Sequence, residues 1–490
     1  MSSDNASSTD RPRRIAIIGG GISGLAAAYR VTEIDPDCQL TLFESKPHVG
    51  GALQTAHEDD LQIEHGVDNF ITTLPWGLSL CKRLGLSDQL VQTNPDFRRT
   101  FVVHRGRTVK MPDGFLMMAP TRMMPLALTP LLSIRGKIRC AMEFFLPRRR
   151  EETDESIGAF ARRRLGNEAF ANLIEPLCGA VYAGDVDKIS IDATLSRFRD
   201  MERKYGSVIR AMLSQIRARK KSAKTKQAVE SGPRFSMFVT LRDGMQLMVD
   251  RIAERLPEGS VRENTSVDTI VKNDDSTWNV TTGEGTTETY DAVVLATPSY
   301  ESGRLLEPID AETAGMLSSI EHSSTAVLTV CYDREQVGHK LDGLGIVVPA
   351  VADSPILAIS LSSRKYPHRA PEGKVLLRVF VGGVRYPELV DMEEEPLQEF
   401  VLKDLAKLLK VEGDPLLVRS ARWRRNMPQY FVGHLDLVDR IEQGVSEIEN
   451  LEVIGNALHG VGIPDCIHTA ELAVNRLFGI EETDTTKHEK

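Results

Sequence analysis

The stretch Arg14-Ile15-Ala16-Ile17-Ile18-Gly19-Gly20-Gly21-Ile22-Ser23-Gly24 decides the fold of this chain. Its first five residues form an apolar run that predicts a buried strand over 14–18. The glycines mark a turn, and the alanine-rich segment after them predicts a helix from about residue 23 to residue 34. Pro36 and Asp37 end that helix, and a second apolar strand is expected over 39–43. This βαβ unit with a short crossover indicates a parallel sheet and an α/β fold.

The glycines of this turn have the spacing G-x-G-x-x-G, with Gly20, Ile22 and Ser23 at the variable positions. In such a turn Gly19 permits a tight bend, Gly21 lets the backbone approach a pyrophosphate, and Gly24 lets helix and strand pack closely. The first N–H groups of the helix then face the diphosphate. Glu44 ends the second strand, where a carboxylate binds ribose hydroxyls and repels a 2′-phosphate. The sequence therefore predicts a dinucleotide site and disfavours NADP.

Two further glycine motifs favour FAD over NAD. Val49-Gly50-Gly51 follows Glu44 closely and resembles the extended E-x5-GG fingerprint of FAD enzymes of the amine oxidase class. Near the other end of the chain, Gly455-Asn456 closes a predicted strand, and Gly460-Val461-Gly462-Ile463-Pro464 leads into the last predicted helix. The N-terminus of that helix would stabilise negative charge on a reduced flavin.

Composition limits the class of protein. The chain has 490 residues and a formal net charge of −9, which gives no general attraction for nucleic acid. Six widely spaced cysteines indicate buried, reduced thiols, and neither they nor the histidines show metal-ligand spacing. No apolar run is long enough to span a bilayer, and the polar N-terminus does not resemble a signal peptide. We expect a cytoplasmic enzyme without a metal.

The order of predicted elements indicates a discontinuous Rossmann-like FAD domain with two insertions. We assign residues 14–77, 233–300 and 418–480 to the FAD domain, residues 78–212 to a helical insertion and residues 301–417 to a β-rich substrate domain. Residues 1–13, 213–232 and 481–490 are expected to be flexible, and the basic stretch 217–227 is interpreted as a loop. The Met-, Leu- and Pro-rich stretch 115–134 suits a lid or a contact with a membrane surface.

Several longer motifs resemble the protoporphyrinogen/coproporphyrinogen oxidase family, in its oxygen-dependent, FAD-containing branch. The resemblance extends from about residue 14 to residue 478, and the chain looks closest to the Gram-positive-type coproporphyrinogen III oxidases. The matching stretches are Ile174–Leu177, Gly179–Asp185, Asp187–Ser190, Tyr366–His368, Pro371–Lys374, Arg422–Trp423, Met427–Tyr430, Gly433–His434 and Gly460–Ile467.

This resemblance implies a fold similar to the monoamine-oxidase-like flavoproteins and a set of FAD contacts. Besides the Gly19–Gly24 turn, these are Glu44, Ser45, Gly51, Ala52, Gly66, Val67, Asp68, Asn69, Val267, Trp423, Val461, Gly462 and Ile463. Val267 would present its backbone to the adenine. Ala52 stands where the family usually has Lys or Arg, which puts one phosphate contact in doubt, and Asn69 stands where Ser is common.

The resemblance also implies the reaction. A porphyrinogen would be oxidised to the porphyrin in haem biosynthesis by removal of six electrons in three flavin turnovers, with O₂ as acceptor and peroxide as product. The flavin performs this chemistry, so no catalytic acid or base is assigned. Carboxylate side chains of the substrate need cationic partners, and the candidates are Arg98, Arg99, Arg105 and Lys188. Coproporphyrinogen III is favoured as substrate over protoporphyrinogen IX.

Other functions remain as alternatives. The same fold class includes amine oxidases and carotenoid desaturases, but an amine site usually needs an aromatic cage, and aromatic residues are only 6% of this chain. A non-catalytic FAD-binding protein is disfavoured by the intact glycine motifs at both ends. A peripheral membrane contact at the inner face of the membrane, a homodimer and a contact with a ferrochelatase stay open, and no nucleic-acid partner is expected.

Overall fold

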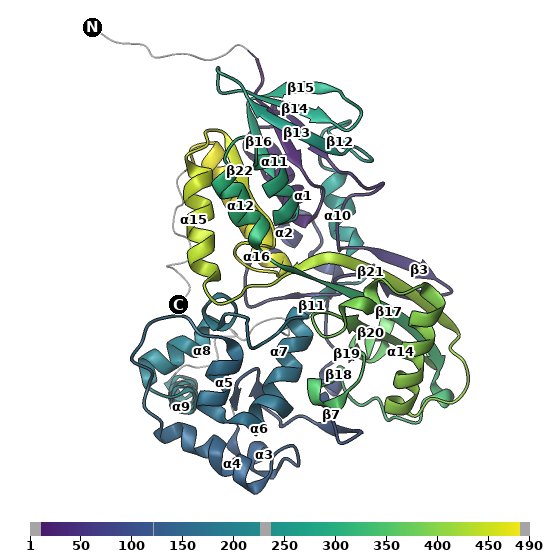
Figure 1. Cartoon of the computed structure of the whole chain (residues 1–490). Coiled ribbons are helices and arrows are strands. Elements are labelled where there is room, and N and C mark those ends of the chain that lie inside the picture. The colour runs from purple at the N-terminus through teal and green to yellow at the C-terminus, as the bar shows by residue number, and fades with distance from the viewer. Residues whose placement is uncertain (1–10, 121, 226–236, 481–490) are drawn as a thin grey trace.

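The computed structural model describes residues 11–120, 122–225 and 237–480. In Figure 1 the chain forms three bodies: a parallel sheet between helices at the top, an antiparallel sheet at the lower right, and a group of helices at the lower left. The first and last thirds of the sequence meet in the upper body, so residues distant in sequence lie side by side there.

The upper body is built on a five-stranded sheet with the order β12-β2-β1-β16-β22, all of whose neighbouring strands are parallel. The strands are β12 (Val261–Arg262), β2 (Gln39–Phe43), β1 (Arg14–Ile18), β16 (Ala292–Leu295) and β22 (Leu451–Val453). The apolar run 14–18 therefore forms the central strand that the sequence predicts. A strand in this position is buried on both faces, which explains its continuous apolar character.

Alternate residues of the parallel sheet enter two different cores, because successive strand side chains point to opposite faces. Ile15 and Ile17 pack against one helical layer, whereas Ala16 and Ile18 pack against the other. The first layer contains α1 (Ile22–Ile34), α2 (Trp76–Arg83), α10 (Gln246–Ala253) and α16 (Ile463–Leu477). The second contains α11 (Ser299–Leu306), α12 (Ala311–Ser319), α15 (His434–Ser446) and the antiparallel meander β13 (Val267–Lys272), β14 (Trp278–Thr282) and β15 (Thr287–Tyr290).

The antiparallel body has seven strands in the order β21-β17-β20-β19-β18-β7-β8. These are β21 (Leu417–Pro428), β17 (His322–Asp333), β20 (Lys374–Gly382), β19 (Ile356–Ser360), β18 (Gly345–Val347), β7 (Thr100–His104) and β8 (Arg107–Lys110). α14 (Glu394–Leu409) packs on one face, in a core that contains Phe101 and Ile346. Val102 and Val347, next to them in sequence, enter the core of the helical body on the opposite face. The sheet thus joins the helical body to α14.

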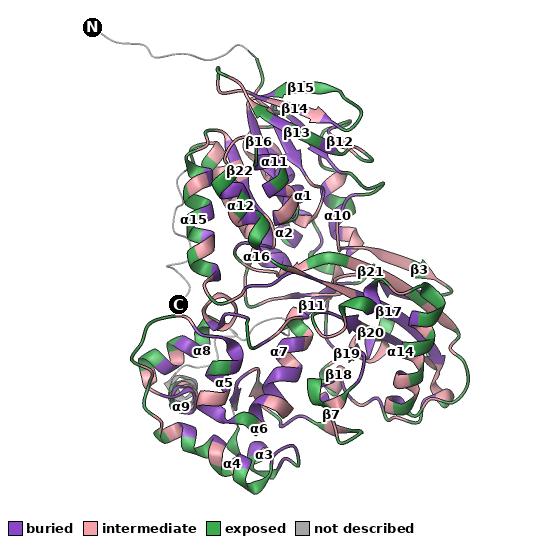
Figure 2. Ribbon diagram, in the orientation of Figure 1, coloured by how far each residue is buried: buried purple, intermediate pink, exposed green. Residues whose placement is uncertain are grey.

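The helical body consists of short helices around one apolar core (Figure 2). It contains α3 (Met123–Leu128), α4 (Ile134–Ala141), η3 (Met142–Phe145), α5 (Ile157–Leu165), α6 (Asn167–Ala169), the π-helical turn η4 (Phe170–Ile174), α7 (Glu175–Tyr182), α8 (Ile191–Tyr205) and α9 (Val208–Thr225). Two smaller strand pairs lie elsewhere: β3 (Thr55–Glu58) with β4 (Leu61–Glu64), and β9 (Phe115–Leu116) with β10 (Ala119–Pro120). A three-stranded sheet is formed by β5 (Phe70–Ile71), β11 (Phe238–Leu241) and β6 (Leu90–Gln92). The remaining elements are α13 (Ser362–Lys365) and the 3₁₀ turns 87–89, 95–97, 334–336, 350–352, 367–369 and 387–390.

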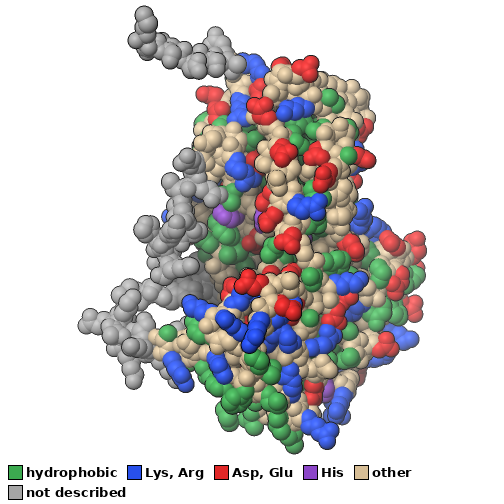
Figure 3. Space-filling model, turned by 60° about the vertical axis from the view of Figure 1, so that its left-hand side comes forward, with side chains coloured by type: hydrophobic (Ala, Val, Ile, Leu, Met, Phe, Trp, Pro, Cys, Tyr) green, Lys and Arg blue, Asp and Glu red, His purple; other side chains and the backbone are tan. Residues whose placement is uncertain are grey.

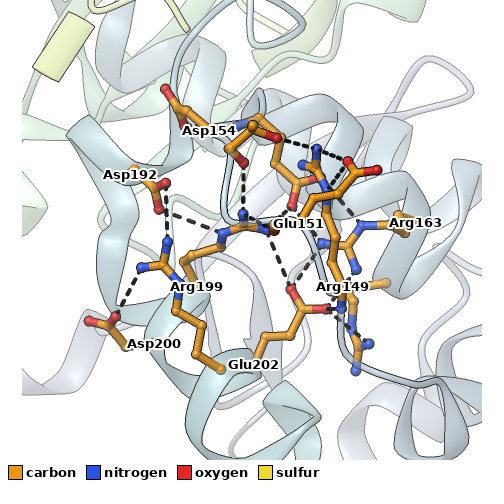
Figure 4. A network of polar contacts seen from close by, with 12 residues as sticks. Arg149, Glu151, Asp154, Arg163, Asp192, Arg199, Asp200 and Glu202 are labelled. Carbon is orange, nitrogen blue, oxygen red and sulfur yellow. Dashed lines mark hydrogen bonds and ion pairs between the residues drawn. The ribbon is translucent and has the colours of Figure 1, made fainter. Parts of the chain in front are cut away.

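A network of ion pairs holds the helical body together (Figure 4). Arg163 of α5 bonds Glu202 of α8 at 2.7 Å and Glu155, just before α5, at 2.6 Å. Arg199 of α8 also bonds Glu155, at 2.5 Å. Arg164, fully buried, pairs with Glu143 of η3. Because each buried charge has opposite charges as partners, removal of one member would leave another unpaired.

The predicted segment boundaries differ from the structure in three places. Residues 90–110, expected to be helical, form β6, β7 and β8, and β21, expected in the FAD domain, belongs to the seven-stranded sheet. α11 and α12, which lie within the predicted substrate domain, pack instead against the parallel sheet. Local periodicity identified strands and helices but could not reveal which sheet a strand joins, because that depends on long-range pairing.

The expected flexible segments also need correction. The predicted flexible segment 213–232, with its loop over 217–227, is wrong as far as Thr225, because α9 continues to that residue, and positions 226–232 lie outside the described residues. The basic stretch contains alanine, lysine and arginine, which are good helix formers. Arg11 bonds Asp291 and Arg13 bonds the Leu477 carbonyl, so the ordered chain begins before the expected position 14. The remaining predicted flexible residues, 1–10, 226–232 and 481–490, are not described.

Among the helices that the structure describes, none combines the length and the apolar character that a bilayer span requires. All six cysteines are buried and unpaired, as the sequence predicts.

Candidate FAD site

The turn between β1 and α1 is shaped by contacts that exclude side chains. A Cβ atom added to Gly24 would lie 1.9 Å from the Gly19 carbonyl oxygen, and one added to Gly19 would lie 2.6 Å from the Ala296 carbonyl oxygen. Gly19 also has a φ of 110°, in the region that favours glycine. A Cβ on Gly21, by contrast, would meet no protein atom within 4 Å. Gly19 and Gly24 therefore serve packing within the fold, and Gly21 leaves an open approach to the backbone.

The N-terminus of α1 lies at this open position and has no side-chain cap. Gly21 is the N-cap residue and supplies no side-chain hydrogen bond, and the first turn contains no acidic residue. Ile22 packs at the edge of the core, and Ser23 is buried. Free N–H groups and the positive end of the helix dipole suit an anion such as a diphosphate.

Glu44 lies at the end of β2 and faces the glycine turn. Its carboxylate accepts hydrogen bonds from the Gly20 amide at 2.8 Å and from the Lys46 amide at 2.9 Å. The Ser45 hydroxyl donates to the same carboxylate at 3.4 Å. These bonds hold Glu44 beside the turn, where the sequence predicts a ribose contact.

The second glycine pair lies directly against the first motif. Gly50 forms an isolated parallel bridge with Gly21, and the Gly50 amide donates to the Gly20 carbonyl at 2.7 Å. A Cβ on Gly51 would lie 3.3 Å from the Gly21 Cα. Ala52 follows Gly51 and brings no cationic side chain to this surface. The fold thus brings the two glycine motifs into one surface.

The segment 65–67 closes the same region through Ala52 and Trp423. The Val67 amide donates to the Ala52 carbonyl at 2.9 Å. A Cβ on Gly66 would lie 2.1 Å from the Ala52 carbonyl oxygen and 2.9 Å from the Trp423 ring. The Trp423 indole N–H donates to the His65 carbonyl at 2.9 Å. Gly66, Val67 and Trp423, predicted as cofactor contacts, therefore pack together although 357 positions separate Gly66 from Trp423.

The carboxylate of Asp68, a predicted cofactor contact, is paired within the protein. Its carboxylate pairs with Lys365 at 3.1 Å, Arg369 at 3.1 Å and Arg378 at 3.4 Å. Burial would raise the pKa of Asp68, but the three cations outweigh burial and lower that pKa below its usual range. The Asn69 amide also donates to this carboxylate, at 2.5 Å. The Asp68 carboxylate thus anchors β20 and α13 beside the Gly66 segment, and the Asn69 amide supports that carboxylate.

The N-terminus of α16 reaches the site from the other end of the chain. Gly462 is its N-cap residue and supplies no side-chain hydrogen bond. Val461 is partly exposed, and Ile463 is buried in the core that contains α1. Ser23 of α1 hydrogen-bonds the Cys466 thiol, whose pKa burial raises to about 12. The N-termini of α1 and α16, from opposite ends of the sequence, therefore lie next to each other, and the Asp465 carboxyl caps that of α16 by accepting a backbone hydrogen bond from Gly462.

Tyr430 and His434 hold the loop that precedes α16. The Tyr430 hydroxyl donates to the Asn456 carbonyl at 2.5 Å and accepts from the Gly460 amide at 2.9 Å. The His434 ring stacks on Tyr430 with centroids 4.0 Å apart, and its Nε2 lies 3.0 Å from the Leu458 carbonyl oxygen. In the sequence these two residues stand only as parts of a motif, because the backbone groups that their side chains bond lie more than twenty positions away.

Val267, the last predicted cofactor contact, is buried at the start of β13. Its carbonyl accepts a hydrogen bond from Arg304 at 3.1 Å. β13 belongs to the meander on the second face of the parallel sheet, and β12, just before it, pairs with β2 beside Glu44.

The predicted substrate cations are scattered. Arg98 and Arg99 are exposed before β7, and Arg99 pairs with Asp342 at 3.2 Å. Arg105 forms the tip of the β7–β8 hairpin, with a φ of 51°, and lines a cavity of about 510 Å³ together with Val351 and Asp404. Lys188 is exposed, with its ammonium 5.7 Å from the centre of the Phe431 ring. The structure does not gather these four cations into one site.

Arg197 of α8 is a cation that the sequence analysis missed. It interacts electrostatically with Tyr182, the last residue of α7, and Tyr182 in turn interacts with Asp465 at the N-terminus of α16. Arg197 is exposed, with its guanidinium 4.6 Å from the centre of the Phe198 ring, and no ion pair joins it to a carboxylate among the described residues. α8 is kinked at Leu195, two residues before it. The only signal in the sequence was one arginine in an amphipathic helix, which does not distinguish it from its neighbours.

This arrangement fits FAD. The open Cβ position of Gly21, the N-terminus of α1 without a side-chain cap, and the fixed carboxylate of Glu44 offer donors for phosphates and an acceptor for a ribose. Gly66, Trp423 and the α16 loop adjoin the same surface and would hold the ring system. Such a site can orient a dinucleotide cofactor and shield one side of its flavin from water.

Comparison with known proteins supports this assignment. The family described as flavin containing amine oxidoreductase matches residues 22–478. A coproporphyrinogen III oxidase of Bacillus subtilis is 34% identical, with 95% of this chain and 98% of that protein covered. A coproporphyrinogen III oxidase of Propionibacterium freudenreichii is 35% identical, covering 95% and 90%, and a chloroplastic protoporphyrinogen oxidase of Nicotiana tabacum is 30% identical, covering 94% and 85%.

Solved structures confirm the predicted fold class. A protein of Exiguobacterium sp. 255-15 assigned as a protoporphyrinogen oxidase superimposes with a TM-score of 0.84 at 30% identity, over 96% of this chain and 99% of that one. A putrescine oxidase superimposes with a TM-score of 0.66 at 15% identity, over 96% and 99%, which shows the shared fold alone. The family, the fold and the resemblance predicted from sequence agree. The chain belongs to the flavin containing amine oxidoreductase family and is an oxidoreductase with FAD as its cofactor.

Proposed function

We propose that this protein oxidises a porphyrinogen to the porphyrin in haem biosynthesis, with coproporphyrinogen III as the preferred substrate. The observation that carries the proposal is similarity along nearly the whole chain to proteins named coproporphyrinogen III oxidase from three bacteria, at 30–35% identity. Because the matches cover 95% of this chain in each case, they include the helical and antiparallel bodies as well as the FAD-binding motifs.

FAD, when bound, supplies two-electron redox chemistry, so a six-electron oxidation would take three rounds, each closed by O₂ with release of peroxide. Within the protein, we propose that Gly19, Gly20, Gly21, Ile22, Ser23 and Gly24 hold the diphosphate and that Glu44 holds the adenosine ribose. Gly66, Trp423, Val461, Gly462 and Ile463 would line the flavin, and Tyr430 keeps the loop before α16 in place.

Arg197 favours an anionic substrate over an amine. It is an exposed guanidinium on α8, near Tyr182, and has no acidic partner among the described residues. A carboxylate side chain of a porphyrinogen would satisfy it with charge-assisted hydrogen bonds, whereas a cationic amine would be repelled. The four carboxylates of coproporphyrinogen III can also engage exposed cations such as Lys188.

Protoporphyrinogen IX is the second candidate, because relatives named protoporphyrinogen oxidase match over a similar length. The deciding experiment supplies each porphyrinogen in turn to the FAD-loaded protein and follows porphyrin fluorescence and peroxide release. We expect faster oxidation of coproporphyrinogen III, with three peroxides per porphyrin. The Gly21→Ala variant, without bound FAD, controls for spontaneous oxidation. Equal inactivity on both porphyrinogens, with FAD bound, would overturn the proposal.

A further inference from the structure

The carboxyl of Asp465 stands at the N-terminus of α16, against the loop that is proposed to line the flavin. It accepts a hydrogen bond from the backbone amide of Gly462. The loop packs closely on this carboxyl: a Cβ added to Gly460 would lie 2.9 Å from Asp465 Oδ2, and one added to Gly462 would lie 2.8 Å from the same atom. Asp465 is therefore bonded to the same stretch of backbone that would contact the cofactor.

Three titratable groups lie near Asp465 and interact with it electrostatically. They are Tyr182 of α7, Tyr430, two residues after β21, and Cys466, its neighbour on α16. Burial raises the pKa of each of the three, that of Cys466 to about 12, so all three are uncharged near neutral pH. No cation forms an ion pair with Asp465 in the part of the chain that the structure describes. Of these four groups, Asp465 alone can exchange a proton near neutral pH.

The surroundings of Asp465 make its protonation sensitive to a second negative charge. Burial raises the pKa of Asp465, and hydrogen bonds from its own amide and from Gly462 offset that effect only in part. Negative charge on a reduced flavin at the same helix N-terminus would raise this pKa further, because like charges repel in a partly desolvated site. Acidic and basic side chains are interspersed over the upper body in Figure 3, so its surface exerts no field of one sign that would override this local effect.

We propose that Asp465 binds a proton when the bound FAD is reduced and releases it when O₂ reoxidises the cofactor. Each round of the proposed reaction removes a hydride and a proton from the porphyrinogen. The hydride reduces FAD, the Asp465 carboxyl holds the proton, and O₂ accepts both as hydrogen peroxide, so charge and hydrogen balance in every round. The origin of the proton rests on the proposed function, whereas the coupling of Asp465 to reduction of FAD requires no porphyrinogen.

The test measures the midpoint potential of FAD in the loaded protein against pH, by anaerobic photoreduction with reference dyes and without porphyrinogen. Reduction by two electrons brings one proton to the flavin. Uptake of a second proton by Asp465 should double the slope of the potential against pH, over the range in which Asp465 is ionised before reduction and protonated after it. Below and above that range the slope should return to the value for one proton, because Asp465 then has the same charge in both states.

Asp465→Asn keeps an oxygen acceptor for the Gly462 amide but cannot take up a proton. It should show the slope for one proton at every pH, and an indicator dye should report one proton fewer taken up per FAD reduced. Asp436→Asn is the matched control, because Asp436 occupies the same position in the first turn of α15 but is exposed. This control should keep the doubled slope of the parent.

Bound FAD, measured by absorbance, and the melting temperature separate a change in proton uptake from a loss of structure. If Asp465→Asn does not retain FAD, Asp465→Ser, which keeps a hydroxyl acceptor, takes its place in the same measurement. The proposal fails if the parent shows the slope for one proton at every pH. It also fails if the Asp465 variant keeps the doubled slope, which would place the second proton on the flavin itself. A doubled slope in the parent with no oxidation of either porphyrinogen would overturn the proposed function and support the coupling.

Discussion

Replacement of Gly21 by alanine separates cofactor binding from folding. Gly21 has φ and ψ of −69° and 178°, which alanine adopts without strain, and an added Cβ would meet no protein atom within 4 Å. The free energy of unfolding of the Gly21→Ala apoprotein should therefore lie within about 0.5 kcal/mol of the parent value. The methyl group would nevertheless stand at the uncapped N-terminus of α1, where the diphosphate is expected to lie.

The expected loss of affinity follows from that position. A diphosphate moved outward by about one methyl radius would lose roughly two charge-assisted hydrogen bonds, each contributing about 1.5–3 kcal/mol. The dissociation constant of FAD should increase by about a hundredfold or more. Gly24→Ala should behave differently, because its Cβ would lie 1.9 Å from the Gly19 carbonyl oxygen. Since α1 must then move away from β1, the apoprotein should lose about 1–3 kcal/mol of stability as well.

The assay combines FAD titration, followed by quenching of flavin fluorescence, with thermal unfolding of the apoprotein. Gly315→Ala in α12 is the matched control: its Cβ would also meet no atom within 4 Å, and it lies on the other face of the sheet. It should bind FAD normally and gain a few tenths of a kcal/mol from its helical position. Normal FAD affinity in Gly21→Ala would refute the placement of the diphosphate at this turn.

Three further outcomes are expected. Tyr430→Phe removes a hydroxyl that bonds both Asn456 and Gly460, so it should lower stability by about 1–3 kcal/mol and weaken FAD binding measured by the same titration. Glu202→Gln should cost about 3 kcal/mol at pH 7 in chemical denaturation. Burial would raise the pKa of Glu202, but hydrogen bonds from Arg163 and a backbone amide outweigh it, so the cost should be present above about pH 4.5 and shrink as the pH falls through the lowered pKa. Arg197→Gln should raise KM for coproporphyrinogen III about tenfold with less effect on kcat, and an unchanged KM would remove Arg197 from the substrate site.

The FAD-binding half of the fold could be predicted from the sequence because its motifs are local. An apolar strand, a glycine turn and an amphipathic helix depend on neighbouring residues, and β1 and β2 have the predicted bounds. The E-x5-GG pair and the last glycine block were recognised in the same way. Positions where the backbone approaches another group closely require glycine, so a glycine motif can be recognised in the sequence before the surrounding atoms are known.

The roles of residues that depend on partners distant in sequence could not be predicted. The ion pairs of Asp68 could not be predicted, because Lys365, Arg369 and Arg378 come to its carboxylate from about three hundred positions away. In the sequence Arg197 does not differ from other helical arginines, because its proximity to Tyr182 of α7 exists only in the folded chain. The sheet to which β7 and β8 belong could not be predicted for the same reason, because its other strands lie more than two hundred residues later in the chain.

The sequence by itself determined that a βαβ unit holds a dinucleotide, that the cofactor is FAD and that the chain is similar to the porphyrinogen oxidases. Only the tertiary structure decided which cations stand together, how the two helix N-termini meet, and that the Asp465 carboxyl stands at one of them near buried hydroxyl and thiol groups. The physical reason is range: the periodicity of strands and helices is set within a few residues, whereas charge pairing, surface exposure and the contacts around a glycine exist only after the chain has folded.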